Sequence, residues 1–235
     1  MGDLWQGLVD ALRLLATGDS DTWQIVLLSL RISVSATIIS LLVGVPVGAA
    51  LALLRFPGRS LVIGLVHMGM GLPPVSVGLI VSILWWRNGP FGAFRLLYTP
   101  TAMIIAQALI AAPIVTGLTV AAVQSLDPRL KLQLLALGAS RWRMTWWLLR
   151  EARIPMLVGV IGGFGAVISE VGAAMMVGGN IKGETRVLTT ATVLEVGRGN
   201  FEVAVAVAVA LTVVLLLLTY LVSLSLTLLQ LRRPR

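Results

Sequence analysis

The chain has 235 residues, of which 57% are hydrophobic and only 12% are charged, and its formal net charge is +8. Soluble domains carry about 25% charged residues, so the composition excludes an ordinary soluble protein and indicates an integral membrane protein. Because cysteine is absent, disulfides, thiolate metal sites and cysteine nucleophiles are excluded, and we expect no metal site. We attribute the positive charge to cytoplasmic loops and expect no nucleic-acid partner.

Residues 1–22 form the first predicted element, an amphipathic segment on the outer face of the membrane. Leu4, Leu8, Leu12 and Leu15 fall near one helical face, with polar residues between them. A helix of this kind lies in the membrane interface and does not cross the bilayer. The sequence therefore predicts a surface segment ahead of the first span.

Five hydrophobic runs follow, and several exceed the roughly 20 residues that a helix needs to cross a bilayer. An alternation of valine and alanine in the last run resembles a strand, but an open strand cannot satisfy its backbone in lipid, so we expect helix there. The sequence predicts an all-α integral membrane protein with about five transmembrane helices. Their expected positions, followed by a short C-terminal tail, are 25–54, 61–86, 101–126, 154–178, 201–231 and 232–235.

The second span contains two adjacent prolines, Pro73 and Pro74. They leave helical carbonyls unpaired at membrane depth, which is tolerated where other helices or a water-filled path supply partners. We therefore expect this helix to bend beside a cavity, and a kinked packing helix is the alternative. For His67, we expect a hydrogen bond between helices, with a ligand-binding or proton-carrying role as the alternative.

Residues 127–153, which we call the elbow, are too charged to lie in lipid and too apolar to be a plain linker. Asp127 can cap a helix that begins at Pro128, because the amide that proline lacks would be unpaired there. Gly138 supplies a left-handed stop, and Ser140 can cap a second helix. The sequence predicts two short helices joined at Gly138, with arginine and tryptophan side chains suited to contact another protein.

The fourth span is rich in glycine and contains an acid, Glu170. Gly159 and Gly163 form a face of small residues that allows close helix packing. An ionisable group at membrane depth costs at least a few kcal/mol unless it is paired or faces water. Glu170 therefore indicates either a functional site or a structural hydrogen bond to a neighbouring helix.

Most lysines and arginines outside the spans lie in the turn at 55–59, the elbow and the C-terminal tail. The positive-inside rule places these segments in the cytoplasm and the N-terminus outside. The chain has no GxxxxGK[ST] phosphate-binding loop, so energy for transport must come from a partner or from an ion gradient. A secondary transporter built on Glu170 is possible, although a proton path normally needs several titratable groups in series.

Three stretches resemble known transport proteins. The elbow, followed by Pro155, resembles the coupling loop of ABC-importer permeases, the segment that fits into a cleft of the ATPase subunit. Residues 72–79 resemble the corresponding helix of molybdate-type permeases, and residues 163–181 with 185–191 are most similar to tungstate-importer permeases. The resemblance covers nearly the whole chain from the first span onward. The residues of the coupling loop are Ala136, Leu137, Gly138, Ala139, Ser140, Arg141 and Trp142.

The resemblance implies a type I ABC-importer permease fold and a role as the permease subunit of an importer of a tetrahedral oxyanion, with tungstate favoured over molybdate and sulfate. It implies a homodimer in a prokaryotic cytoplasmic membrane, an outer oxyanion-binding protein, and cytoplasmic ATPase subunits that bind ATP and magnesium. The chain itself is then neither an enzyme nor the holder of a cofactor. The family's Glu-Ala-Ala opening would fall at residues 132–134, where this chain has Leu-Gln-Leu.

The resemblance also implies roles for individual residues. We expect Glu170 to be a structural acid within the membrane, since a carboxylate has the wrong charge to bind an anion. The hydroxyls of Thr189 and Thr190 belong to a predicted short helix after the fourth span. Residues assigned to the translocation path or its gate are Pro73, Pro74, Ser76, Ser169, Thr189 and Thr190.

Overall fold

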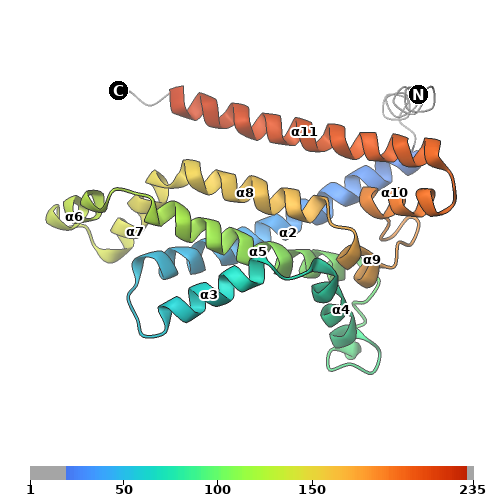
Figure 1. The fold of residues 1–235 in the computed structure, drawn as a ribbon, viewed down its shortest axis with the longest axis horizontal. Helices are drawn as coiled ribbons and strands as arrows, with labels where there is room; N and C mark the ends of the chain where they lie inside the picture. Colours follow the sequence, from blue (N-terminus) through green and yellow to red (C-terminus); the bar gives the residue numbers. More distant parts are fainter. Residues whose placement is uncertain (1–19, 232–235) are drawn as a thin grey trace. The chain divides into compact units, whose positions relative to one another are not determined.

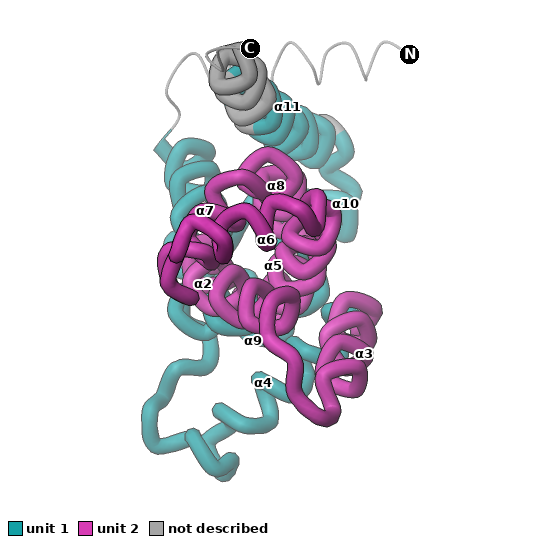
Figure 2. Tube along the Cα trace, turned by 90° about the vertical axis from the view of Figure 1, so that its left-hand side faces the viewer, with its two compact units in different colours: residues 1–35, 73–107, 167–235 teal, residues 36–72, 108–166 magenta. Residues whose placement is uncertain are grey.

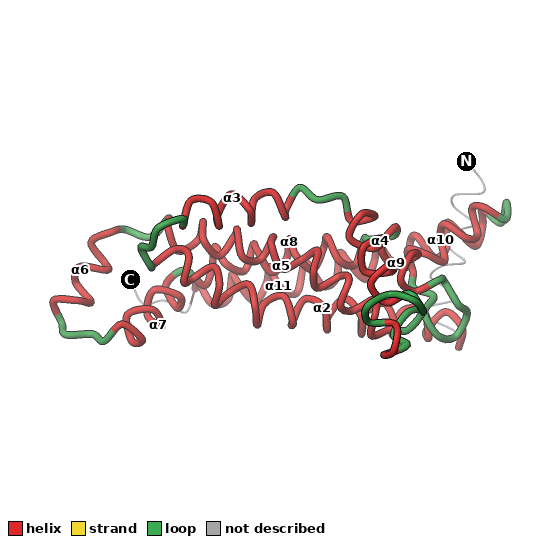
Figure 3. Tube along the Cα trace, turned by 90° about the horizontal axis from the view of Figure 1, so that it is seen from below, coloured by secondary structure: helices red, strands yellow, loops and turns green. Residues whose placement is uncertain are grey.

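The computed structural model describes residues 20–231, which form helices joined by turns and loops, without any strand in that range (Figure 1, Figure 3). The predicted amphipathic segment lies outside the described residues except for its last three positions, and so does the tail at 232–235. The helices are α2 Ser20–Leu53, α3 Arg59–Met70, α4 Pro74–Trp85, a 3-10 turn η1 Gly92–Phe94, α5 Pro100–Gln124, α6 Pro128–Ala136, α7 Arg141–Glu151, α8 Arg153–Ile168, α9 Gly172–Gly178, α10 Leu188–Gly197 and α11 Phe201–Leu231.

Three of the described helices, α2, α5 and α11, are long and apolar enough to cross a membrane. The number rises to five when the interrupted pairs α3 with α4 and α7 with α8 are each counted as one span. The predicted all-α fold with about five spans is confirmed. Pro46 and Pro113 lie inside α2 and α5 without ending either helix.

The chain forms two compact units, which Figure 2 shows in different colours. Unit 1 comprises residues 1–35, 73–107 and 167–235, and unit 2 comprises residues 36–72 and 108–166. Within the described part of unit 1, α4 packs against α9, and α10 packs against α11. Its main core cluster contains Ile32, Val81, Ala102, Met103, Ala106, Ala174, Val177 and Val187.

Unit 2 is assembled by small residues that let helix backbones approach. A Cβ added at Gly44 would lie 2.8 Å from Val115 Cγ1, so α2 and α5 meet here without room for a side chain. A Cβ at Gly159 would lie 3.0 Å from Leu118 Cβ, and one at Gly163 would lie 3.2 Å from Val115 Cγ2. The close packing predicted for the Gly159 and Gly163 face is therefore confirmed, and its partner is α5.

The helix that we expected to bend at Pro73 and Pro74 is broken there into two separate helices, so the prediction of one bent helix is wrong. Helix α3 ends at Met70, and α4 begins at Pro74, which occupies its first turn. Proline has no amide hydrogen and disfavours the helical conformation of the residue before it, so two prolines in sequence end the first helix. Pro73 is extended, with a ψ of 123°.

The prediction that residues 154–178 form one continuous helix is wrong. Helix α8 ends at Ile168, and α9 begins at Gly172, which leaves Ser169, Glu170 and Val171 between them. Composition alone did not reveal the break, because the flanking residues are as apolar as those of a continuous span. The physical reason is a side-chain contact made by Glu170, described below.

Candidate functional site

The elbow has the geometry that its sequence predicts. The side chain of Asp127 accepts a hydrogen bond from the amide of Arg129 at 2.8 Å, and Pro128 opens α6. The amide of Ala139 donates to the carbonyl of Leu134 at 3.0 Å, which closes the end of that helix. Ser140 then caps α7 by accepting from the amide of Arg143 at 3.4 Å.

Gly138 is the hinge between the two elbow helices. Its φ is +73°, a left-handed conformation that residues with a side chain rarely adopt. A Cβ added there would meet nothing within 4 Å, so glycine is required for backbone conformation and not for space. Gly138 therefore differs from Gly44, Gly159 and Gly163 in unit 2, where a Cβ would be too close to a neighbouring helix.

The elbow exposes several large apolar side chains among its arginines. Leu137 is 83% exposed and Trp142 is 80% exposed, with Leu132 and Trp146 also open to the surroundings. On its other face, Met144 and Leu148 are buried and fix α7 to unit 2. Exposed apolar patches of this kind mark surfaces that contact other proteins or membranes. The elbow is thus anchored on one side and open on the other.

Glu170 lies in the break between α8 and α9, and its carboxylate holds the start of α9. Its Oε1 accepts a hydrogen bond from the amide of Ala173 at 2.9 Å. The first amides of a helix have no partner within the helix, and an acid there is favoured by the helix dipole. The residue that we expected inside a helix therefore terminates one helix and begins the next.

A second contact joins α10 to the same break. Thr189 Oγ1 donates to the carbonyl oxygen of Glu170 at 2.9 Å. Thr190 Oγ1 exchanges hydrogen bonds with the backbone of Val187, both at 3.1 Å, and so caps α10. Both threonine side chains are buried. Whether they line a path stays a prediction.

The other proposed path residues occupy different surroundings within unit 1. Ser76 is exposed on α4, two residues after Pro74, and Ser169 is exposed beside Glu170. His67, on α3 of unit 2, is exposed, and no described residue hydrogen-bonds to its side chain. The interhelical hydrogen bond expected for His67 is therefore wrong for this chain, because α3 buries none of its residues.

Sequence reasoning missed two groups of polar residues. Thr185 is fully buried and ties the chain after α9, since its Oγ1 donates to the carbonyl of Gly178 at 2.5 Å and accepts from the amide of Ile181 at 3.0 Å. Four buried hydroxyl residues also lie along α2 at helical spacing, and that spacing is the signal that could have revealed them. They are Ser29, Ser33, Thr37 and Ser40.

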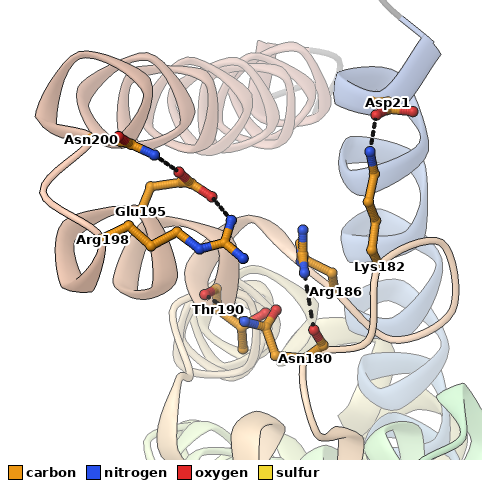
Figure 4. Close-up of polar contacts among 8 residues, drawn as sticks. All are labelled: Asp21, Asn180, Lys182, Arg186, Thr190, Glu195, Arg198 and Asn200. Carbon is orange, nitrogen blue, oxygen red and sulfur yellow. Dashed lines mark hydrogen bonds and ion pairs between the residues drawn. The ribbon is translucent and has the colours of Figure 1, made fainter.

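A basic cavity of about 290 Å³ lies beside the first turns of α2 in unit 1. Its lining includes Asp21, Arg31, Lys182 and Arg186, so three cations face one acid. Lys182 Nζ lies 2.5 Å from Asp21 Oδ2, and Arg186 donates to the carbonyl of Asn180 at 3.4 Å (Figure 4). The remaining excess of positive charge suits an anion.

Another polar cluster, formed by Glu195, Arg198 and Asn200, connects α10 to α11 (Figure 4). Glu195 accepts from Asn200 Nδ2 at 2.9 Å and from Arg198 at 3.0 Å. The hydrogen bond from Asn200 is the main cause that holds the pKa of Glu195 below its ordinary value. Burial opposes this shift, and the charge and hydrogen bond of Arg198 add to it. The carboxylate is therefore the form that secures this turn.

The described helices that are long and apolar enough to cross a bilayer define a polytopic membrane protein. The elbow is a segment between two of them with large apolar side chains exposed. The chain belongs to the family described as binding-protein-dependent transport system inner membrane component, whose model matches residues 44–234. This family assigns it to the permeases of ABC importers, which work with an ATPase and a binding protein.

The chain is also similar to individual proteins of this family. The chain is 38% identical over 199 residues to the tungstate uptake system permease protein TupB of Peptoclostridium acidaminophilum, covering 85% of this chain and 87% of that protein. It is 30% identical to the molybdenum transport system permease protein ModB of Escherichia coli strain K12, covering 72% and 77% respectively. In structure it is similar to a chain of the MetNI methionine ABC transporter in inward-facing conformations, with a TM-score of 0.66, 18% identity, and coverage of 93% of this chain and 95% of that chain.

Proposed function

We propose that this chain is the membrane-spanning subunit of an ATP-driven importer of a tetrahedral oxyanion, with tungstate as its substrate. Two copies form the translocation path, cytoplasmic ATPase subunits bind ATP and magnesium, and an outer binding protein delivers the anion. The chain itself catalyses no reaction. Similarity to permeases named for tungstate and molybdenum supports the substrate class, and molybdate and sulfate are the alternatives of similar size and charge.

The observation that supports this function most directly is the elbow. Leu137 and Trp142 project from a segment whose two helix caps and glycine hinge hold it in one shape. Aromatic and arginine side chains are enriched at the energetic centres of protein interfaces. The ATPase subunit is the partner that this rigid and apolar surface fits, even without the family's acidic opening at residues 132–134.

The basic cavity near the start of α2 supports an anionic substrate. Helix α2 is long enough to cross a bilayer, so its first and last turns lie on opposite sides of the membrane. If the elbow faces the cytoplasm, Lys182 and Arg186 lie on the outer side, where a dianion arrives. An excess of cations there raises the local concentration of the anion without a tight site.

We assign residues to the translocation path or its gate because they lie at or beside the two helix breaks. Pro73, Pro74 and Ser76 belong to a helix break that resembles the gate regions of other transporters, where interrupted helices expose polar backbone. Thr189, Thr190 and Ser169 lie next to the second break. Glu170 has a structural role at that break, because its carboxylate is already committed to the amide of Ala173.

The docking role is tested with Leu137→Asp, which places a charge on the exposed tip of the elbow. We expect uptake of tungstate and substrate-stimulated ATPase activity of the assembled importer both to fall at least tenfold, because a desolvated charge is costly in an apolar interface. The matched control is Val196→Asp on α10, an exposed apolar position in unit 1. Retention of both activities in Leu137→Asp, or uptake by the purified chain alone under a proton gradient, would overturn the proposal.

A further inference from the structure

Two cavities of unit 2 meet where the end of α2 faces the elbow. The first is a groove of about 290 Å³ between the last turns of α2 and one face of α7. Its walls are almost entirely apolar, and we call it the apolar groove. The residues that matter here are Val45, Pro46 and Ala49 of α2, and Trp142, Trp146 and Leu149 of α7.

The second cavity, which we call the basic pocket, has a volume of about 440 Å³. Arg55, Lys131 and Arg141 line it, each from a different segment of the chain, and Leu135 and Met144 are also in its lining. No acidic residue is among the described residues that line it. Three cations that converge without a balancing acid repel one another, so a bound anion would relieve this repulsion.

The two cavities adjoin. Leu53, Leu54 and Thr145 line both of them, so the apolar groove and the basic pocket are neighbours at the end of α2. From Val45 to Leu53 the groove follows α2 for about 12 Å at the rise of an α-helix. The lining of the two cavities therefore changes along the axis of α2. It is apolar beside Val45 and becomes cationic beyond Leu53, at the C-terminal end of the helix.

We propose that these two adjoining cavities together bind one anionic phospholipid. The phosphate of the lipid lies among Arg55, Lys131 and Arg141, and an acyl chain follows the apolar groove toward Val45. Basic pockets between helices near the cytoplasmic surface are suited to anionic headgroups, and tryptophan side chains favour the same interfacial depth. The choice of leaflet rests on the orientation given under the proposed function, whereas the site itself does not.

An acidic segment of the ATPase is the other occupant with suitable charge. It would satisfy the basic pocket but leave the apolar groove empty, although the groove shares three of its residues with that pocket. A phospholipid satisfies both parts at once, because its charge and its hydrocarbon are joined in one molecule. The three residues shared by the two linings thus favour lipid over protein.

The test measures lipid retention by the purified full-length permease, without ATPase. The protein is placed in nanodiscs that contain equal amounts of phosphatidylglycerol and phosphatidylcholine with the same acyl chains, and retained lipid is counted by native mass spectrometry. We expect wild type to retain phosphatidylglycerol preferentially. The double variant Arg55→Gln with Lys131→Gln should lower this preference by about 25-fold, because each basic residue at a membrane surface contributes roughly fivefold.

Two controls separate this site from general charge effects and from a site for a free anion. Arg129→Gln with Arg143→Gln removes the same charge from α6 and α7 but touches neither cavity, so the preference should remain. Ala50→Trp fills the apolar groove and should reduce retention of both lipids, whereas Val47→Trp, exposed on the same helix outside the groove, should not. Inorganic phosphate should not displace the retained lipid at equal concentration.

Several results would overturn the proposal. Equal retention of the two lipids by wild type would do so, as would an unchanged preference in Arg55→Gln with Lys131→Gln. Displacement by inorganic phosphate would indicate a site for a free anion. If the double variant kept its lipid but lost co-purification with the ATPase, the basic pocket would be a protein contact. None of these measurements involves transport, so failure here leaves the proposed function standing.

Discussion

Thr189 Oγ1 donates a hydrogen bond to the carbonyl oxygen of Glu170 at 2.9 Å, which joins α10 to the break between α8 and α9. The two residues are 19 positions apart, and the chain between them includes all of α9 and the loop fixed by Thr185. This contact closes a compact polar substructure within unit 1. Its integrity determines whether the break keeps one defined shape.

Replacing Thr189 with valine should loosen this substructure. The side chain keeps its volume but loses the donor, and the carbonyl of Glu170 is left without this partner. We expect a loss of about 1 kcal/mol of stability, seen as a fall of about 2–4 °C in the midpoint of thermal unfolding in detergent. Thr189→Ser keeps the hydroxyl and should unfold close to wild type. An identical midpoint for the valine variant would show that the bond contributes nothing.

Substitutions of Glu170 separate its charge from its hydrogen bond. Glu170→Gln retains an oxygen that can accept from the amide of Ala173, so we expect most of the stability and assembly to remain. Glu170→Ala removes the acceptor and should cost about 1–2 kcal/mol, in the range of a lost helix cap. Thermal unfolding and size-exclusion chromatography of both variants measure the effect. Equal behaviour of alanine and glutamine variants would contradict a capping role.

Which residues can replace Gly138 should depend on how readily they adopt its left-handed backbone conformation, and not on the size of their side chains. A Cβ finds no obstacle there, but a φ of +73° costs an alanine about 1–2 kcal/mol. Asparagine adopts this region more readily, so Gly138→Asn should keep more ATPase coupling than Gly138→Ala, although its side chain is larger. Substrate-stimulated ATPase activity of the assembled importer ranks the two variants. The opposite order would mean that space, and not conformation, limits this position.

The turn held by Glu195 should depend on pH. Because the pKa of Glu195 is lowered in the folded chain, its stabilising effect is fully present above the pKa of the unfolded chain, about 4.3. The effect is lost as the pH falls through the lower folded pKa. Exchange of the amides of Arg198, Gly199 and Asn200 should be compared as protection factors, because the intrinsic exchange rate itself changes with pH. In wild type these protection factors should fall as the pH falls through the folded pKa of Glu195. In Glu195→Gln they should be lower than in wild type near neutral pH and should change less as the pH falls.

The elbow was predictable from the sequence because its determinants are local. Asp127 with Pro128, Gly138 and Ser140 each act on atoms within a few residues, so the caps and the turn are encoded where they occur. The paired prolines broke the second span for the same reason. Overall hydrophobicity likewise predicted an all-helical membrane protein, since a bilayer leaves the backbone few other choices.

Only the tertiary structure decided the features that depend on contacts distant in sequence. Glu170 looked like an acid inside a span, and its position at a helix break depends on Ala173 and on Thr189 from another helix. The apolar groove and the adjoining basic pocket need α2 and the elbow to meet, about 90 residues apart along the chain. Local propensity sets where helices begin and end, whereas packing determines which side chains share a cavity, and no pattern along the chain specifies that second outcome.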